Sequence, residues 1–350
     1  MIFIAWSKVV VIARSTRIAS RRFFANLFSQ SFACTNIGNR LSREYFLRDR
    51  NETSVRELTD LARAMRPKQW TKNLIIFFPM AFSLNLFWGF GDPFVWRLLL
   101  QSSATFLLFC TISSGIYLIN DLVDIESDRA HPVKRLRPIA SGRVNTSTAI
   151  ICASILLGLS VAMGFMMMME LGLVMLTYVV LMVLYSFYLK RVVIIDVGVI
   201  AAGFVIRVVA GASVISVPVS PWLYICTIFG ALFIGFAKRR NELKVLEGDA
   251  VADHRDTLRD YSIPLLDQLI AVVVPSTLIA YSVYAATADV PRQMIMTVPF
   301  IVYGLFRYLF LVHSKDLGGK PEEILLRDKP LLGNILLWAI TSGGVLFLFR

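Results

Sequence analysis

The chain has 350 residues, of which 56% are hydrophobic and 17% are charged, and its formal net charge is +12. Soluble domains carry about 25% charged residues, so this composition excludes an ordinary soluble protein. Several apolar runs reach the roughly 20 residues that a membrane-spanning helix needs, and we expect an all-α polytopic membrane protein. The positive charge is concentrated in particular loops, so it does not indicate nucleic-acid binding, and no nucleic-acid partner is expected.

The first 65 residues differ from the rest of the chain, because six bases and no acid occur up to Leu41. We interpret residues 1–65 as a basic extension that lies on the membrane surface or is disordered. A targeting segment and a wrongly assigned start remain alternatives. Residues 66–350 are expected to form one transmembrane domain.

Nine spans are predicted from the apolar runs that follow Asn73. Their ranges are 74–88, 97–119, 146–168, 171–189, 194–216, 221–237, 264–286, 294–312 and 331–349. Bases gather in every second loop, and the positive-inside rule places these loops and the N terminus in the cytoplasm. The polar chemistry is therefore expected at the cytoplasmic face.

Cysteine and histidine do not indicate a site. The four cysteines are far apart and the chain has only three histidines, so disulfides, zinc and a histidine-centred mechanism are all disfavoured.

The segment from Asn120 to Gly142, NDLVDIESDRAHPVKRLRPIASG, places acids and then bases after the second predicted span. Asp121, Asp124 and Asp128 are three and four residues apart, so a continued helix aligns them with Asn120 on one face. Negative charge is unfavourable at a helix C terminus, and a divalent cation would offset it. Oxygen ligands favour Mg²⁺, which completes its shell with phosphate oxygens. We predict a metal site formed by these four residues, with a salt-bridged helix end as the alternative.

Bases in this and other segments could bind the phosphates of one ligand. A diphosphate suits the cluster formed by Lys134, Arg135 and Arg137. Arg207, within the fifth predicted span, is expected to face the interior and meet an anion. The other candidates lie at the ends of predicted spans and could instead be membrane anchors, belt residues or helix-end salt bridges: Lys68, Lys72, Asn73, Tyr185, Lys190, Lys238, Arg239 and Glu242. Asp253, Asp256 and Asp260 are also spaced three and four residues apart. They form either a second metal motif or one side of a solvated, salt-bridged helix.

These segments resemble the UbiA-type prenyltransferase superfamily. In particular, NDLVDIESD resembles the first aspartate-rich motif of that superfamily. RPKQWTKN, YSFYLKR, GFVIRVVAG, KRRNEL and GGKPEEILLRD are most similar to the branch of decaprenyl-phosphate phosphoribosyltransferases. The resemblance covers about Arg66 to Trp338. KRRNEL stands where aromatic prenyltransferases of the superfamily carry a second aspartate-rich motif.

The resemblance implies a nine-helix UbiA-like bundle in a bacterial plasma membrane. It implies Mg²⁺-dependent transfer of a 5-phosphoribosyl group from phosphoribosyl diphosphate to a polyprenyl phosphate of decaprenyl type. Asp121, Asp124 and Asp128 are the implied catalytic residues, and the product would feed arabinosyl- or ribosyl-lipid and cell-wall synthesis. A homo-oligomer is compatible with this assignment. The alternatives are an aromatic prenyltransferase that uses a polyprenyl diphosphate and, less favoured because few charges lie within the spans, a transporter.

Overall fold

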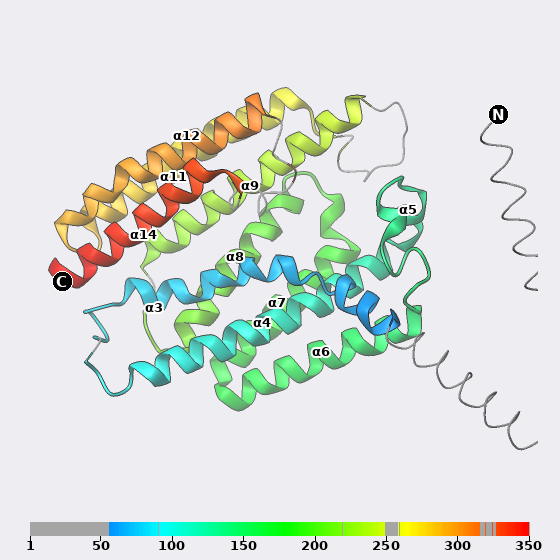
Figure 1. Ribbon diagram of the computed structural model, residues 1–350, viewed down its shortest axis with the longest axis horizontal. Helices are drawn as coiled ribbons and strands as arrows, with labels where there is room; N and C mark the ends of the chain where they lie inside the picture. The colour runs from blue at the N-terminus through cyan, green and yellow to red at the C-terminus, as the bar shows by residue number, and fades with distance from the viewer. Residues whose placement is uncertain are drawn as a thin grey trace, which may run out of the picture. The chain divides into compact units, whose positions relative to one another are not determined.

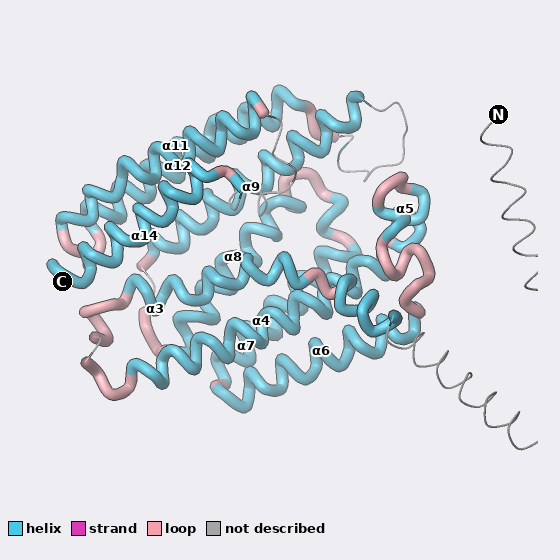
Figure 2. Tube along the Cα trace, in the orientation of Figure 1, coloured by secondary structure: helices cyan, strands magenta, loops and turns pink. Residues whose placement is uncertain are grey.

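The computed structural model describes residues 56–89, 91–218, 220–248, 258, 260–315, 319, 324 and 327–349. The chain divides into two compact units, Met1–Thr59 and Asp60–Arg350, and the following concerns the second. Within the described residues this unit is helical (Figures 1 and 2), and its one β contact is an isolated bridge between Leu84 and Trp88. The predicted all-α class is confirmed.

Among the described residues, eight helices are long and apolar enough to cross a membrane. In chain order they are α4 (Val95–Val123), α6 (Thr146–Met167), α7 (Met169–Phe187), α8 (Ile195–Val214), α9 (Pro221–Gly248), α11 (Ile263–Thr287), η5 with α12 (Arg292–Thr297 and Val298–Ser314) and α14 (Lys329–Phe349). They correspond to eight of the predicted spans. The main difference is α9, which continues about three turns beyond the predicted end at residue 237.

The first predicted span, 74–88, is not among these eight helices. Its place is taken by the 3₁₀ helix η2 (Pro67–Phe77) and the short α3 (Phe78–Phe82). Residues 83–88 form a turn, which the Trp88 indole closes by donating to Ser83 Oγ at 3.0 Å. Because a 3₁₀ helix rises about 2.0 Å per residue, η2 and α3 together extend about 30 Å, the thickness of the hydrocarbon core. The count of nine spans stays a prediction.

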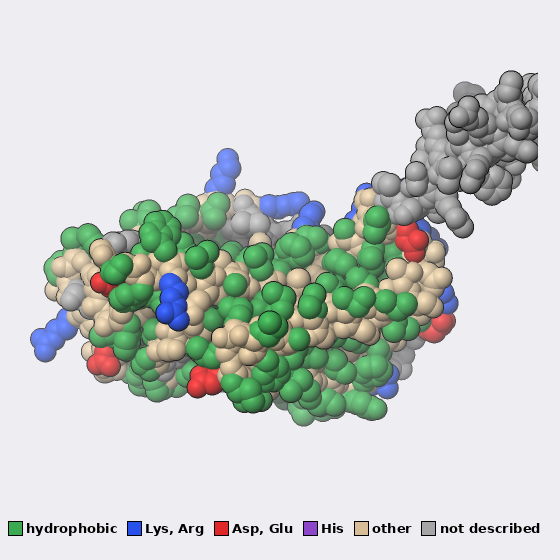
Figure 3. All heavy atoms as spheres, turned by 90° about the horizontal axis from the view of Figure 1, so that it is seen from below, with side chains coloured by type: hydrophobic (Ala, Val, Ile, Leu, Met, Phe, Trp, Pro, Cys, Tyr) green, Lys and Arg blue, Asp and Glu red, His purple; other side chains and the backbone are tan. Residues whose placement is uncertain are grey.

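The outward surfaces of the helices are apolar. On α6, Ile150, Ile151, Ile155 and Leu159 are each more than half exposed. Figure 3 shows one face of the molecule, covered mainly by hydrophobic side chains. Exposed apolar surface of this extent is unfavourable in water and favourable against lipid. The protein is therefore a multi-pass membrane protein.

Helix α8 positions the parts of the site, because it packs against η2, α4, α7 and α9. The contact with η2 is close: a side chain on Gly211 would overlap the carbonyl oxygen of Ile76. We call the end of the bundle that carries Asp121–Asp128 the aspartate end. Figure 1 shows that α5 (Ile125–Ala130), which belongs to this end, and the C terminus lie at opposite ends of the helices.

Candidate functional site

The three aspartates keep the helical spacing that the sequence predicts. Helix α4 ends at Val123, and Asp124 has the backbone angles φ −91° and ψ 9° before α5 begins. Hydrogen bonds still continue across this break, from Asp124 N to Asn120 O at 3.0 Å and from Asp128 N to Asp124 O at 2.8 Å. Asp121 and Asp128 therefore remain on a common side of the chain.

One guanidinium bridges two of the aspartates. Arg137 Nη1 donates to Asp121 Oδ1 at 3.1 Å and to Asp128 Oδ2 at 2.6 Å. Both aspartates are only 2% exposed. Carboxylates shielded from water to this degree need cations nearby, and Arg137 supplies one for both.

Arg66 is a second cation at Asp121, and the sequence pattern does not predict it. Its guanidinium donates to Asp121 Oδ1 and lies 5.0 Å from the centre of the Tyr117 ring. Arg66 is the N-cap of η2 and has a left-handed backbone, with φ 54° and ψ 59°. Such angles are uncommon for residues other than glycine and are concentrated at functional sites. The sequence signal that could have singled out Arg66 is the Arg-Pro pair. Proline at the first helical position leaves the preceding residue outside the helix.

Asp124 has different partners. Lys190, in the 3₁₀ turn η4 (Leu189–Arg191), forms an ion pair with Asp124 Oδ1 and is 5% exposed. Asn120 Nδ2 donates to Asp124 Oδ2 at 3.1 Å. The structure thus brings Lys190 to an aspartate 66 residues away in the sequence.

The donor atoms at the aspartate end fit Mg²⁺ chemically. Within the described part of the chain, no three His, Cys, Asp or Glu side chains are grouped closely enough to hold a metal by themselves. Asp121 and Asp128 nevertheless contact the same cationic nitrogen of Arg137, so the space between them accommodates positive charge. Mg²⁺ commonly takes one or two carboxylates and completes its shell with water and phosphate oxygens. These residues suit such a partial shell.

Other predicted bases lie on segments that reach this end. Lys68 and Lys72 belong to η2, which Arg66 precedes, and Lys72 donates to Gln69 Oε1 at 2.8 Å. Lys134 and Arg135 belong to the 3₁₀ turn η3 (Lys134–Leu136), in which Arg135 is exposed and Lys134 half-buried.

Asn73 and Arg207 lie together but deeper in the bundle. Arg207 Nε donates to Asn73 Oδ1 at 2.7 Å. Asn73 also contacts Cys110 and Ser113 of α4, which precede Asp121 by eleven and eight residues. At 1.5 Å per residue, the pair lies about 12–16 Å below Asp121 along the helix. The structure therefore separates these two predicted residues from the aspartates.

The end of α9 carries a second charged cluster. Arg239 is 4% exposed, and its guanidinium donates to Asp196 Oδ2 at 2.7 Å and to Glu242 Oε2 at 2.5 Å. Lys238 lies 3.9 Å from Glu242. Tyr185 lies in the last turn of α7, near Arg239. Asp253 and Asp256 lie outside the described residues, and Asp260 is exposed.

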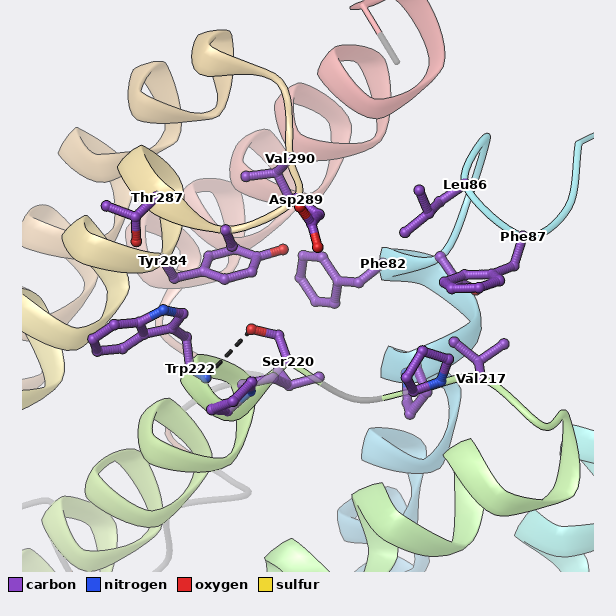
Figure 4. A pocket seen from close by; sticks show the side chains of 16 residues that line it. Phe82, Leu86, Phe87, Val217, Ser220, Trp222, Tyr284, Thr287, Asp289 and Val290 are labelled. Carbon is purple, nitrogen blue, oxygen red and sulfur yellow. Dashed lines mark hydrogen bonds between the residues drawn. The ribbon is translucent and has the colours of Figure 1, made fainter.

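Cavities in the described part of the chain lie away from these charges. One of about 280 Å³ has an almost wholly apolar lining that includes Phe78, Phe204 and Trp338. Another of about 380 Å³ lies where the α3–α4, α8–α9 and α11–η5 connections meet, at the end opposite the aspartates. Figure 4 shows Phe82, Trp222 and Tyr284 around it, together with Asp289. Of the described residues that line this cavity, none was predicted to bind phosphate, so we place the candidate site at the aspartate end.

Comparison with known proteins identifies similar sequences and folds. The profile of the UbiA prenyltransferase family matches residues 76–322. Decaprenyl-phosphate phosphoribosyltransferase of Mycolicibacterium smegmatis is 31% identical over 83% of this chain and 93% of that protein. The Mycobacterium tuberculosis protein with the same name is 33% identical over 81% and 93%. A UbiA homolog from Archaeoglobus fulgidus, solved bound to DMAPP and Mg²⁺, aligns with a TM-score of 0.62 at 18% identity and covers 83% of this chain and 100% of that chain.

Proposed function

The chain belongs to the UbiA prenyltransferase family and is a membrane transferase, and we propose that it transfers a 5-phosphoribosyl group from phosphoribosyl diphosphate to a polyprenyl phosphate, releasing diphosphate. The observation that carries the proposal is the charge arrangement at the aspartate end. Three carboxylates meet Arg66, Arg137 and Lys190 there. The names of the relatives support transfer of a phosphoribosyl group to a polyprenyl phosphate by this chain.

The acids and bases have complementary roles in this proposal. Asn120, Asp121, Asp124 and Asp128 would hold Mg²⁺, and the A. fulgidus homolog bound to Mg²⁺ supports its use here. When bound, this ion supplies positive charge to the diphosphate leaving group. Arg137 and the exposed Arg135 donate hydrogen bonds to diphosphate oxygens, for which planar guanidinium groups are well suited. Charge that develops on the leaving group is thereby stabilised.

The surplus of bases favours a donor with an additional phosphate. Lys190 pairs with Asp124 at the aspartate end, and Lys238 lies near Glu242 in the charged cluster of α9. Each of the two clusters therefore contains a lysine. We assign Lys68, Lys72, Lys190, Lys238 and Arg239 to the donor's 5-phosphate and the acceptor phosphate as a group. A prenyl diphosphate has no such third phosphate, and it is the less favoured donor for this reason.

The acceptor needs no general base from the protein. A phosphate monoester is already an anion near neutral pH, since its second pKa is about 6. It attacks C1 of the ribose as the bond to the diphosphate breaks. The apolar cavity lined by Phe78, Phe204 and Trp338 suits part of the polyprenyl tail.

The proposal also places the enzyme in the cell. The site faces the cytoplasm of a bacterial plasma membrane, where phosphoribosyl diphosphate is available, and the N terminus lies on the same side. Residues 1–65 are a basic extension, and residues 66–350 form the catalytic domain. The product would be a precursor of arabinosyl or ribosyl lipids for the cell wall.

The direct test is transfer of label. Purified protein in lipid nanodiscs is incubated with Mg²⁺, phosphoribosyl diphosphate labelled in the ribose, and polyprenyl phosphates of several lengths. We expect label in the extracted lipid, with release of diphosphate. Label from a prenyl diphosphate appearing on an aromatic acceptor, with no consumption of phosphoribosyl diphosphate, would replace the proposal by the aromatic prenyltransferase alternative.

The metal assignment is tested separately with Asp121→Asn. The variant keeps the side-chain shape but loses the charge that faces Arg66 and Arg137. We expect activity at saturating donor to fall at least a hundredfold, and the Mg²⁺ concentration for half-maximal activity to rise. Undiminished activity in excess EDTA would contradict the assignment.

A further inference from the structure

The hydroxyl of Tyr261 joins two segments of the cytoplasmic half that are distant in the sequence. It accepts a hydrogen bond from the backbone N–H of Ile194 at 2.7 Å and donates one to Asp196 Oδ1 at 2.8 Å. Tyr261 itself is 4% exposed. One oxygen atom therefore holds both the start of α8 and a carboxylate of its first turn.

The backbone at Ile194 shows that this start is constrained. Ile194 is the N-cap of α8 and has φ 68° and ψ −44°. Positive φ is rare for a β-branched residue, and such strain persists only where the surroundings enforce it. The bond from Ile194 N to Tyr261 is one of the contacts that enforce it. The same bond orders the chain that leads back to η4, which ends three residues earlier at Arg191.

On one side, this constrained chain leads to the aspartates. Lys190 lies four residues before Ile194 and pairs with Asp124. On the other side, Asp196 leads to the end of α9, because its second oxygen accepts from Arg239, and Arg239 also pairs with Glu242. Tyr261 thus stands between the two charged clusters to which the proposed function assigns phosphates of the donor and the acceptor.

The protonation of Tyr261 suits this bridging position. Burial, followed by the hydrogen bond to Asp196, raises the pKa of Tyr261 above its ordinary value. The hydroxyl therefore remains protonated at physiological pH and donates to Asp196.

We propose that Tyr261 is a positioning residue that fixes the loop carrying Lys190 relative to the helix end carrying Lys238, Arg239 and Glu242. Its hydroxyl does not touch substrate. It sets the spacing between two groups of bases, and the binding of a donor with separated phosphates depends on that spacing. The assignment of these bases to donor phosphates rests on the proposed function, whereas the coupling of the two segments does not.

The test variant is Tyr261→Phe, and the matched control is Tyr308→Phe. Both tyrosines are 4% exposed and pack in the same apolar cluster, so phenylalanine keeps the buried ring in each. Tyr308 lies on α12 and belongs to neither charged cluster. If Tyr261→Phe does not yield folded protein, Asp196→Asn, which weakens the same bond, takes its place.

The first measurement is hydrogen–deuterium exchange without substrate. Peptides that cover residues 188–197 should exchange several-fold faster in Tyr261→Phe than in the wild type, while Tyr308→Phe exchanges as the wild type does. Unchanged exchange in Tyr261→Phe would overturn the coupling. This arm gives its answer whether or not the protein uses phosphoribosyl diphosphate.

The second measurement separates positioning from general stability. We expect Tyr261→Phe to raise the KM for the diphosphate donor about tenfold, because both hydrogen bonds of the hydroxyl are lost and the two groups of bases no longer keep a fixed spacing. Its kcat should stay within about twofold. An unchanged donor KM, or a fall in kcat as large as the rise in donor KM, would contradict the proposal. If the wild type consumes a prenyl diphosphate instead, the proposed function fails, and the hydrogen–deuterium exchange alone decides whether Tyr261 couples the two segments.

Discussion

Arg207 buries a positive charge beside partners that carry no formal charge. Its guanidinium donates to Asn73 Oδ1, to the Gly203 carbonyl at 2.8 Å and to the Tyr178 hydroxyl at 2.7 Å. It also lies 4.8 Å from the centre of the Tyr178 ring. A charge inside a membrane domain is expensive unless such contacts replace water. Three hydrogen bonds and an aromatic face provide this replacement, and together they tie α8 to η2 and α7.

This geometry predicts that Arg207 stabilises the fold without binding the donor. Arg207→Lys keeps the charge but loses the planar fork, so we expect it to lose at least one charged hydrogen bond, or about 1.5–3 kcal/mol. The apparent melting temperature in detergent should fall by several degrees, while the donor KM stays within twofold. The exposed Arg97→Lys serves as the control and should melt as the wild type does. A tenfold rise in donor KM with unchanged melting would instead make Arg207 a phosphate ligand.

Residues of the candidate site differ in how far the sequence can predict them. The alignment of Asp121, Asp124 and Asp128 can be predicted from the sequence, because the three residues lie within about two helical turns of one another. Lys190 is foreseeable as a base at a span end, although its pairing with Asp124 is not. Arg66 and Tyr261 depend on contacts with residues 55 and 65 positions away. No local pattern encodes those contacts, so only the folded chain identifies them.

Contacts between distant segments also limit how far the helices can be predicted from the sequence. Eight spans follow from apolar runs that are long enough to be unambiguous. The first predicted span takes a different form, η2 followed by α3, because hydropathy registers the apolar run but not the kind of helix. Pro67 starts η2 ahead of that run, and Ser83 begins the turn that ends α3 within it. The 3₁₀ form of η2 is supported by tertiary contacts, including Trp70 Nε1 to Ser114 Oγ at 3.1 Å.

Close packing of η2 against α8 gives a prediction for two glycines of one helix. Gly211→Ala would place a methyl group against the Ile76 carbonyl, whereas the space beside Gly198 is open. We expect Gly211→Ala to destabilise the protein by about 1–3 kcal/mol, as overpacking does. Gly198→Ala should be neutral or stabilising by up to about 1 kcal/mol, since alanine is the better helix former. Thermal unfolding in the same detergent compares them, and equal melting of both variants would refute the close contact.

At the scale of the whole molecule, the function requires the aspartate end to face the cytoplasm. Val133, in the segment after α5, and Leu86, in the turn after α3, are both exposed and lie at opposite ends of the bundle. Each is replaced by cysteine in a background in which the four native cysteines are alanine. We expect a membrane-impermeant maleimide to label Leu86→Cys in intact cells and Val133→Cys only after permeabilisation. Retained transferase activity in both variants is the control for folding. The opposite labelling pattern would place the aspartates on the outer face, away from phosphoribosyl diphosphate, and would rule out the proposed donor even if the fold and the family assignment stand.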